Sequence, residues 1–324
     1  MKSIYGVLAA LLVSLAPGSA IAQANYPEQT VRILVGFSPG VAPDVTARLL
    51  ADKLSEAWGK PVVVENVTGA GGNIAVGRVA KAAPDGHILG MNGNGSLVFG
   101  PSMVEKLGFD PIRDFAPISQ IFVGANVLVV PNDVPARTLP ELVALARAQP
   151  GKLTYAHAGA GTSQHLAAEL FKSMARLDIQ PVAYRGTTAL LPDLLAGRVT
   201  MSFGNVVNVL PLVREGKLRA FAVTSVKRSA TAPDLPTMAE SGFPEFEAVP
   251  WFALMAPART PSAIVGRIHR DTVKILAMPD VRRKLNDLGL EVIGSSPAEL
   301  AAVIEREIPQ WARVIKQAGI KASE

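Results

Sequence analysis

Short apolar runs alternate along the chain with longer segments in which apolar residues recur every three or four positions. The first runs cover 31–35, 61–65 and 87–91, and helical patterns occupy about 44–58 and the stretch up to 82. The runs have the length and the β-branched content of strands, whereas the segments between them have the helical period. This β-loop-α order predicts a parallel sheet with helices on both faces.

A second set of alternating elements begins near residue 120. Strands are predicted at 127–130, 152–156, 182–184, 199–203, 220–224 and 252–256, and helices at 163–174 and 188–196. Thr138 with Glu141, and Ser296 with Glu299, have the spacing of capping boxes, and Thr260-Pro261 is a further predicted helix start. Each half therefore reads as a doubly wound unit, and the predicted fold class is α/β with two such domains.

The first two dozen residues have the pattern of a secretory signal peptide. Lys2 precedes an apolar stretch at 4–15, and small residues at 20–24 fit a cleavage site. The apolar stretch is shorter than the roughly 20 residues that span a bilayer. We therefore expect residues 1–24 to be a signal peptide, cleavage near Gln23 or Asn25, and an exported, soluble mature chain.

Composition excludes several classes of protein. The chain has 324 residues, of which 49% are hydrophobic and 18% are charged, so a disordered chain is excluded. The formal net charge of +5 is spread along the chain without a basic block, which argues against nucleic-acid binding. The absence of cysteine excludes disulfides, thiolate metal sites and cysteine nucleophiles.

Four loops that follow predicted strands carry the most distinctive composition. They cover 37–44, 69–73, 92–96 and 159–165 and are rich in Gly, Ser, Thr and Asn. Ligands of α/β folds bind at the carboxyl ends of strands, where loops lead into helices. Backbone N–H groups at helix starts bind anions without a charged side chain, so these loops indicate an anionic ligand, most simply a carboxylate.

Enzyme and cofactor patterns are missing or incomplete. The chain has no Gly-x-Ser-x-Gly, no His-Glu-x-x-His and no phosphate-loop motif, and Ile74 replaces the third glycine of a dinucleotide fingerprint. His165 and Glu169 would share one helical face, yet no third metal ligand lies near them. Asp44 would serve as a general base, but its place at a helix start favours capping or loop shaping. We expect no catalytic residue, no metal and no cofactor.

Many short motifs occur in a familiar order along nearly the whole mature chain. They include Tyr26-Pro27, the loop 37–44, Val63-Val64-Glu65-Asn66, Gly69-Ala70-Gly71-Gly72-Asn73, Gly161-Thr162-Ser163 with His165, Tyr184-Arg185-Gly186 and Pro257-Ala258. On these motifs the chain resembles the substrate-binding proteins of tripartite tricarboxylate transporters, the Bug family of periplasmic receptors.

The resemblance implies a periplasmic binding protein-like (type II) fold, in which two α/β domains enclose a cleft. Domain 1 would cover 25–122 and 249–324, domain 2 would cover 123–248, and the hinges would be 114–120 and 246–252. The implied partners are a small organic acid and, transiently, the membrane subunits of a transporter. A monomer in the periplasm is expected.

The resemblance also implies that a ligand carboxylate lies between the first loop and the glycine-threonine helix start of the other domain. The candidate ligand-binding residues are Phe37, Ser38, Gly40, Val41, Ala42, Asp44, Asn92, Asn94, Ala160, Gly161, Thr162, Ser163, His165 and Asn205. One departure from the family pattern concerns the first loop, where Val41 and Pro43 stiffen the backbone and Pro43 lacks an N–H donor. The identity of the carboxylate therefore stays open.

Two other functions compete with a transport receptor. One is a ligand-dependent sensor that docks on a membrane histidine kinase, and the other is a secreted α/β hydrolase. The missing nucleophile, base and metal patterns argue against the hydrolase, whereas the receptor and the sensor would share one binding site.

Overall fold

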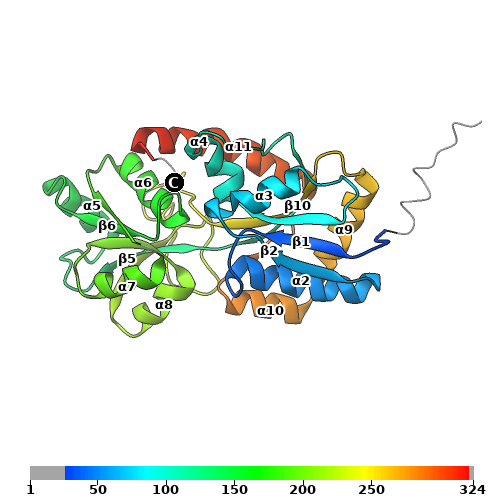
Figure 1. Cartoon of the computed structure of the whole chain (residues 1–324). Coiled ribbons are helices and arrows are strands. Elements are labelled where there is room, and N and C mark those ends of the chain that lie inside the picture. Colours follow the sequence, from blue (N-terminus) through cyan, green and yellow to red (C-terminus); the bar gives the residue numbers. More distant parts are fainter. Residues whose placement is uncertain (1–25, 185, 321–324) are drawn as a thin grey trace, which may run out of the picture.

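The structure, a computed structural model, describes residues 26–320 with the exception of residue 185 (Figure 1). The predicted signal peptide and its cleavage site lie outside the described residues. Between residues 26 and 320 no helix has the length and apolar character needed to cross a membrane.

The strands of the described chain form two sheets. The six-stranded sheet has the order β11-β4-β10-β3-β1-β2 and the five-stranded sheet the order β7-β6-β8-β5-β9. The strand bounds are β1 Val31–Val35, β2 Val62–Asn66, β3 Ile88–Gly93, β4 Phe115–Val123, β5 Asn126–Pro131, β6 Thr154–His157, β7 Gln180–Ala183, β8 Met201–Asn205, β9 Leu218–Val223, β10 Trp251–Pro257 and β11 Glu291–Val292.

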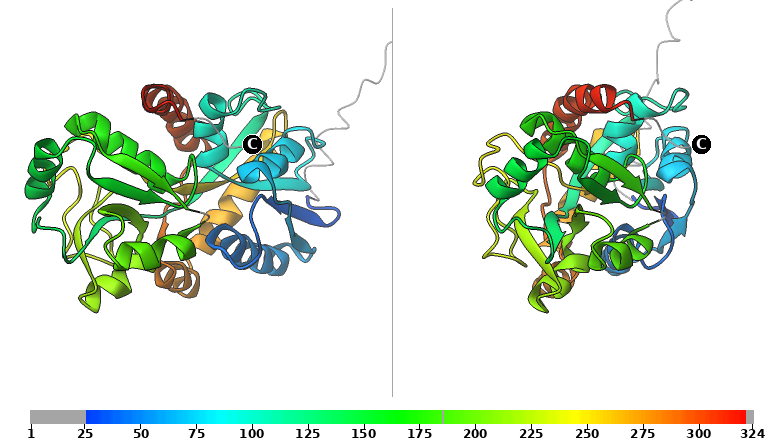
Figure 2. Two further views of the ribbon diagram at one scale, coloured as in Figure 1. Left: turned by 60° about the vertical axis from the view of Figure 1, so that its left-hand side comes forward. Right: turned by 90° about the vertical axis from the view of Figure 1, so that its left-hand side faces the viewer.

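Helices cover both faces of each sheet, and the two sheets with their helices form two lobes (Figure 2). The helix bounds are α2 Ala42–Trp58, η1 Ala70–Gly72, α3 Asn73–Ala80, η2 Gly95–Phe99, α4 Gly100–Met103, α5 Leu139–Ala148, α6 Ser163–Ala175, α7 Thr187–Leu195, α8 Val206–Arg214, α9 Ser262–Leu276, α10 Pro279–Asp287 and α11 Pro297–Ala318.

Both sheets are mixed, whereas the sequence pattern predicted parallel ones. β1 runs parallel to β2 and β3, but β10 runs antiparallel to both β3 and β4. Likewise β6 is parallel to β7 and β8, whereas β5 is antiparallel to β8 and β9. The reason is the path of the chain. β5 and β10 are the strands by which it enters a sheet from the other one, so they start at the junction where the neighbouring strands end.

The chain passes between the sheets at two points that lie side by side. It leaves β4 through Gly124 and Ala125, and it returns to β10 through Pro250; the N–H of Gly124 donates to the carbonyl of Pro250 at 2.7 Å. The predicted hinge at 114–120 is therefore wrong in position, because nearly all of that segment belongs to β4. Strands of the six-stranded sheet come from 31–123 and 251–292, and those of the other sheet from 126–223.

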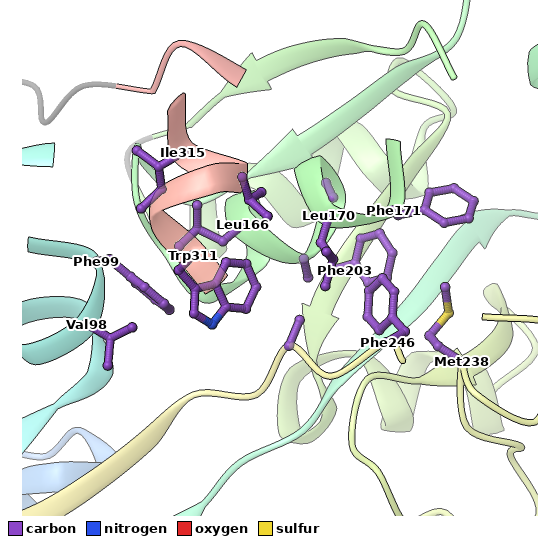
Figure 3. Close-up of a cluster of buried hydrophobic side chains, with 14 of the residues drawn as sticks. Val98, Phe99, Leu166, Leu170, Phe171, Phe203, Met238, Phe246, Trp311 and Ile315 are labelled. Atoms are coloured by element: carbon purple, nitrogen blue, oxygen red, sulfur yellow. The ribbon is translucent and has the colours of Figure 1, made fainter. Parts of the chain in front are cut away.

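Apolar side chains of the C-terminal helix α11 join the two lobes. In Figure 1 this red helix lies along the top of the molecule, and its Trp311 ring packs edge-on against Phe99 of η2 at 5.2 Å. Figure 3 shows Trp311 and Ile315 beside Leu166 of α6, so one buried cluster continues from one lobe into the other. Burial of such side chains is the main stabilising term of the fold.

Local capping signals set several helix starts as predicted. Ser296 and Glu299 form a complete capping box at α11. Thr138 caps α5, but the Glu141 carboxylate accepts from the N–H of Arg137, so that box is incomplete. The predicted cap at Thr260 is wrong: its hydroxyl donates to the carbonyl of Pro257 at 2.7 Å, and α9 starts after Pro261 without a side-chain cap.

Candidate functional site

Strand direction brings the predicted loops to one place. β10 and β5 start at the junction of the two sheets, and their first residues pair with the last residues of β3 and β8: Phe252 with Gly93, and Asn126 with Asn205. β3 and β8 therefore end at the junction, as do β1 and β6, which run parallel to them. The loops that follow these four strands therefore lie at the facing ends of the sheets. This is the place where α/β folds hold ligands.

Asp44 organises the first loop, which runs from 36 to 41. Its carboxylate, only 1% exposed, accepts from the N–H of Gly40 at 2.8 Å and from Nδ2 of Asn66 at 2.8 Å. Arg48 on the next turn of α2 donates to it from Nε at 3.1 Å, and the second guanidinium nitrogen forms an ion pair with it at 3.0 Å. Burial would raise the pKa of Asp44, but these hydrogen bonds and the Arg48 charge hold it below its ordinary value of 3.8. The carboxylate is thus fully used inside the protein, which is the loop-shaping role.

The start of α2 is open to the junction. Val41 is the N-cap residue and provides no side-chain cap, and Ser38, Gly40 and Val41 are exposed. A 17-residue helix carries partial positive charge at such an end, which favours an anion there. Phe37 lies behind the loop with its ring edge-on to Phe252 at 5.4 Å.

The glycine loop before α3 supports the first loop from behind. The backbones at Gly36 and Gly72 pack closely together, because a Cβ at Gly36 would lie 2.6 Å from the Cα of Gly72. A side chain at Gly36 would therefore force the two backbones apart. The side of Gly72 faces the Phe37 ring and the Ser96 hydroxyl, at 3.4 Å and 3.6 Å from a built Cβ. Close backbone approach thus explains the glycines at these positions.

The second loop, Gly159 to Thr162, leads into α6 in the other lobe. Thr162 is the N-cap: its hydroxyl accepts from the N–H of His165 at 3.4 Å and donates to the carbonyl of Gly159 at 2.9 Å. The Ser163 hydroxyl accepts from Nδ2 of Asn126 at 3.1 Å. A Cβ at Gly161 would lie 2.2 Å from Cε of Met103, so this loop contacts α4 across the junction.

His165 points back into its own lobe. Its Nδ1 accepts from the N–H of Gly161 at 3.2 Å, and its ring stacks on that of His157 with centroids 4.0 Å apart and planes inclined by 12°. Burial, the neighbouring His157 and the charge of Lys172 lower the pKa of His165 to about 4. Burial also lowers the pKa of His157, against smaller opposing effects of Gly159 and Glu169. Both rings are therefore neutral at pH 7.

The three predicted asparagines have different surroundings. Asn94 donates to the carbonyl of Val249 at 2.8 Å and so ties the end of β3 to the returning chain. Asn205 caps α8 by accepting from the N–H of Val207 at 3.3 Å. Asn92 is 2% exposed beside Gly90, and both its amide atoms lack a hydrogen-bond partner among the described residues.

A groove of about 400 Å³ lies on the other side of the crossing segments, at the β9 and β11 edges of the sheets. It is lined by Val206, Val207, Leu210, Pro211, Arg214, Ala230, Thr231, Pro233, Asn286, Asp287 and Gly289. None of the predicted site residues lines it.

In the part of the chain that the structure describes, no group of three His, Asp or Glu side chains is placed to hold a metal ion. Glu169 is bound instead by Lys172, at 2.7 Å, and by the Tyr155 hydroxyl. Sequence reasoning missed His157 and Asn126, which support the second loop, and Asn66 and Arg48, which support the first. His157 ends the strand directly before the loop, which is the signal that would have identified it.

The whole chain is similar in sequence and fold to a family of known proteins. The family model described as tripartite tricarboxylate transporter family receptor matches residues 46–320. The chain belongs to this receptor family. The family is one of solute-binding receptors, and the α/β fold with two sheets is the fold of its solved members.

Similar proteins match this chain over nearly their whole length. Protein BugT of Bordetella pertussis is 33% identical over 99% of each chain. The structure described as R. palustris Rpa4515 with adipate is 35% identical with a TM-score of 0.77, and it covers 92% of this chain and 100% of that chain. MatC of Rhodopseudomonas palustris with bound malate is 33% identical with a TM-score of 0.74, at 90% and 100% coverage.

Proposed function

We propose that the mature protein is a periplasmic receptor that captures a small organic carboxylate at the junction of its two sheets and delivers it to a tripartite tricarboxylate transporter. The observation that supports the proposal is the pair of loops, one from each lobe, that follow strands running toward the junction and lead directly into α2 and α6. Two similar structures are described with adipate and malate, which are both dicarboxylates.

The chemistry of the two loops suits a carboxylate. Each ends at a helix N-terminus, where unpaired N–H groups and the helix dipole favour negative charge. Arg48 lies next to the first loop, but its guanidinium is paired with Asp44. It therefore stabilises the loop and does not bind the ligand. Recognition would therefore rest on fixed backbone dipoles, with hydroxyl groups such as those of Ser38 and Ser163 choosing among acids.

Capture would proceed by closure of two domains about the crossing segments. The proposed division is 25–122 with 249–324 against 123–248, and the membership of the strands in the two sheets supports it. Movement about Gly124 and Pro250 would bring α2 and α6 toward one ligand. Such a ligand binds the closed form better and so shifts the population toward it.

Isothermal titration tests the proposal. The purified mature chain is unfolded and refolded to remove any bound acid, then titrated with adipate and with malate. Dimethyl adipate, which has the same carbon chain without charge, is the control. We expect saturable binding of at least one dicarboxylate, no binding of the diester, and recovery of the acid unchanged by NMR. Chemical conversion of the acid, or equal binding of acid and diester, would contradict the proposal.

A further inference from the structure

A stacked pair of histidines lies at the base of the second loop. His157 is the last residue of β6 and His165 lies in the first turn of α6, so the loop between them begins and ends next to the pair. The rings are 4.0 Å apart and nearly parallel, and the two residues are 3% and 8% exposed. The pair is therefore a buried support for the segment that faces the junction.

Each ring reaches the backbone of one loop residue. Nδ1 of His165 lies 3.2 Å from the nitrogen of Gly161. The Gly161 N–H is the donor, so Nδ1 of His165 must offer its lone pair and carry no proton. Nδ1 of His157 lies 2.9 Å from the carbonyl oxygen of Gly159 and 3.3 Å from the nitrogen of the same residue, so it has a partner at Gly159 in either tautomer. His165, by contrast, accepts from Gly161 only while its Nδ1 is unprotonated.

The surroundings keep both rings uncharged. Tyr155 lies beside them with ring centroids 5.8 Å from His157 and 6.1 Å from His165. Glu169, the carboxylate on the same helix, is already engaged by Lys172 and by the Tyr155 hydroxyl. Lys172 adds a positive charge to the cluster, and a second imidazolium at stacking distance would add repulsion.

We propose that His165 is a positioning residue: through its neutral Nδ1 it holds the N–H of Gly161, and with it the loop from Gly159 to Thr162, in the shape that binds the ligand, while His157 fixes the other end of the loop at Gly159. The inference rests on the proposed function, since it names how that site is held in place. It also changes the role expected for His165 from ligand contact to support of the loop.

Gly161 is the point at which this support matters. Its φ of +71° lies in the left-handed region, and its α-carbon is packed against Met103 of the other lobe. A glycine is free to leave this conformation unless a contact holds it. The Gly161 N–H donates to His165, so loss of this hydrogen bond would release the loop at the surface where the two lobes meet.

Two variants separate the acceptor atom from the ring. His165→Asn places an amide oxygen close to the position of Nδ1, so it keeps an acceptor for Gly161 but cannot become charged and cannot stack as a ring. His165→Leu removes the acceptor and keeps an apolar side chain of similar size. Adipate and malate are the ligands used, by titration at pH 7 on samples shown to be folded by circular dichroism. We expect His165→Asn to bind within about threefold of the wild type, and His165→Leu to bind at least tenfold more weakly.

A ligand-free measurement keeps the test independent of the ligand. Hydrogen exchange of the Gly161 amide, followed by NMR, should be slow in the wild type and in His165→Asn and fast in His165→Leu. The pH profile is a second readout. The ratio of the wild-type Kd to the His165→Asn Kd should stay constant from pH 8 to pH 6 and rise toward pH 4, because only the wild type gains a proton at this position; the ratio cancels the titration of the acid itself.

The outcomes distinguish the two proposals. If the wild type binds an acid and His165→Leu binds it equally well, the positioning role fails and the receptor function stands. If His165→Asn is as weak as His165→Leu, the ring itself is needed and the acceptor mechanism is overturned. If the wild type binds no dicarboxylate, the proposed function fails, and Gly161 exchange still decides whether His165 holds the loop.

Discussion

Replacing Asp44 by asparagine tests how the first loop is held. Oδ2 of the carboxylate accepts from the N–H of Gly40, and Oδ1 accepts from Nδ2 of Asn66. An amide has one acceptor oxygen, so one of these donors must face an NH₂ group in Asp44→Asn. Rotating the Asn66 amide does not relieve this, because Nδ2 of Asn66 also donates to the carbonyl of Phe37 and its Oδ1 accepts from Arg48, both at 2.9 Å.

The magnitude follows from the number of hydrogen bonds lost. One hydrogen bond to a charged acceptor contributes about 1.5–3 kcal/mol. Because Gly40 lies in an exposed loop, where water replaces part of the lost contact, we expect a loss of about 1–2 kcal/mol in the free energy of unfolding. Where the ligand needs the loop in its folded shape, the same free energy weakens binding by about 5- to 30-fold.

Urea unfolding and titration with the acid that the wild type binds measure the two effects. Asp52→Asn is the matched control, since Asp52 lies exposed on the same helix and the charge change is equal. The pKa of Asp44 is lowered in the folded state, so its contribution is complete above the ordinary value of 3.8 and is lost as the pH falls below it. The stability gap between the wild type and Asp44→Asn should therefore narrow only below about pH 3.8. Equal loss in Asp44→Asn and Asp52→Asn at pH 7 would refute the reasoning, because it would trace the effect to net charge.

Three further predictions concern capping, a buried acid and closure. Thr162→Ala and Thr138→Ala each remove a helix cap and should each cost about 1 kcal/mol in urea unfolding, but only Thr162→Ala should weaken acid binding; equal affinities would confine Thr162 to a structural role. Burial raises the pKa of Glu307, which accepts from the indole N–H of Trp251, to about 7. The folded state therefore holds a proton that the unfolded state releases, and the free energy of unfolding should fall as the pH rises from 4.5 through 7. Glu307→Gln keeps an acceptor and should raise the Tm at pH 8 but not at pH 4; a change in Tm that is the same at both pH values would count against this assignment. Small-angle scattering should show a smaller radius of gyration at saturation with a confirmed ligand, and an unchanged radius would argue against closure.

The local parts of the fold were predictable from the residues. Thr138 and Ser296 cap the helices that they were expected to cap, because the capping atoms lie within three residues of one another. The predicted loops 37–44, 69–73 and 159–165 follow strands as expected, whereas 92–96 consists of the end of β3, Asn94 and the start of η2. The strand β4 was missed, because Pro117 interrupts its apolar run and the sheet accommodates this residue only through a register shift opposite Met255.

The directions of the strands and the point where the chain crosses between the sheets, by contrast, were decided by the tertiary structure. A strand pattern has the same period in either direction, so it cannot tell that β5 and β10 start at the junction and run against their neighbours. The crossing of the chain at Gly124 and the packing of α11 against both lobes also depend on contacts between segments far apart in the sequence.

The candidate site divides in the same way. The glycines, Thr162 and Asp44 were visible in the sequence, because a loop before a helix start needs such residues in local order. The partners that hold these loops are Asn66 on a neighbouring strand, Asn126 beyond the crossing and His157 stacked on His165. Asn66 and Asn126 could not be predicted, because only the folded backbone brings them within hydrogen-bond distance of the loops. His157 could have been predicted as a loop residue from its place at the end of a strand, but its stacking on His165 could not.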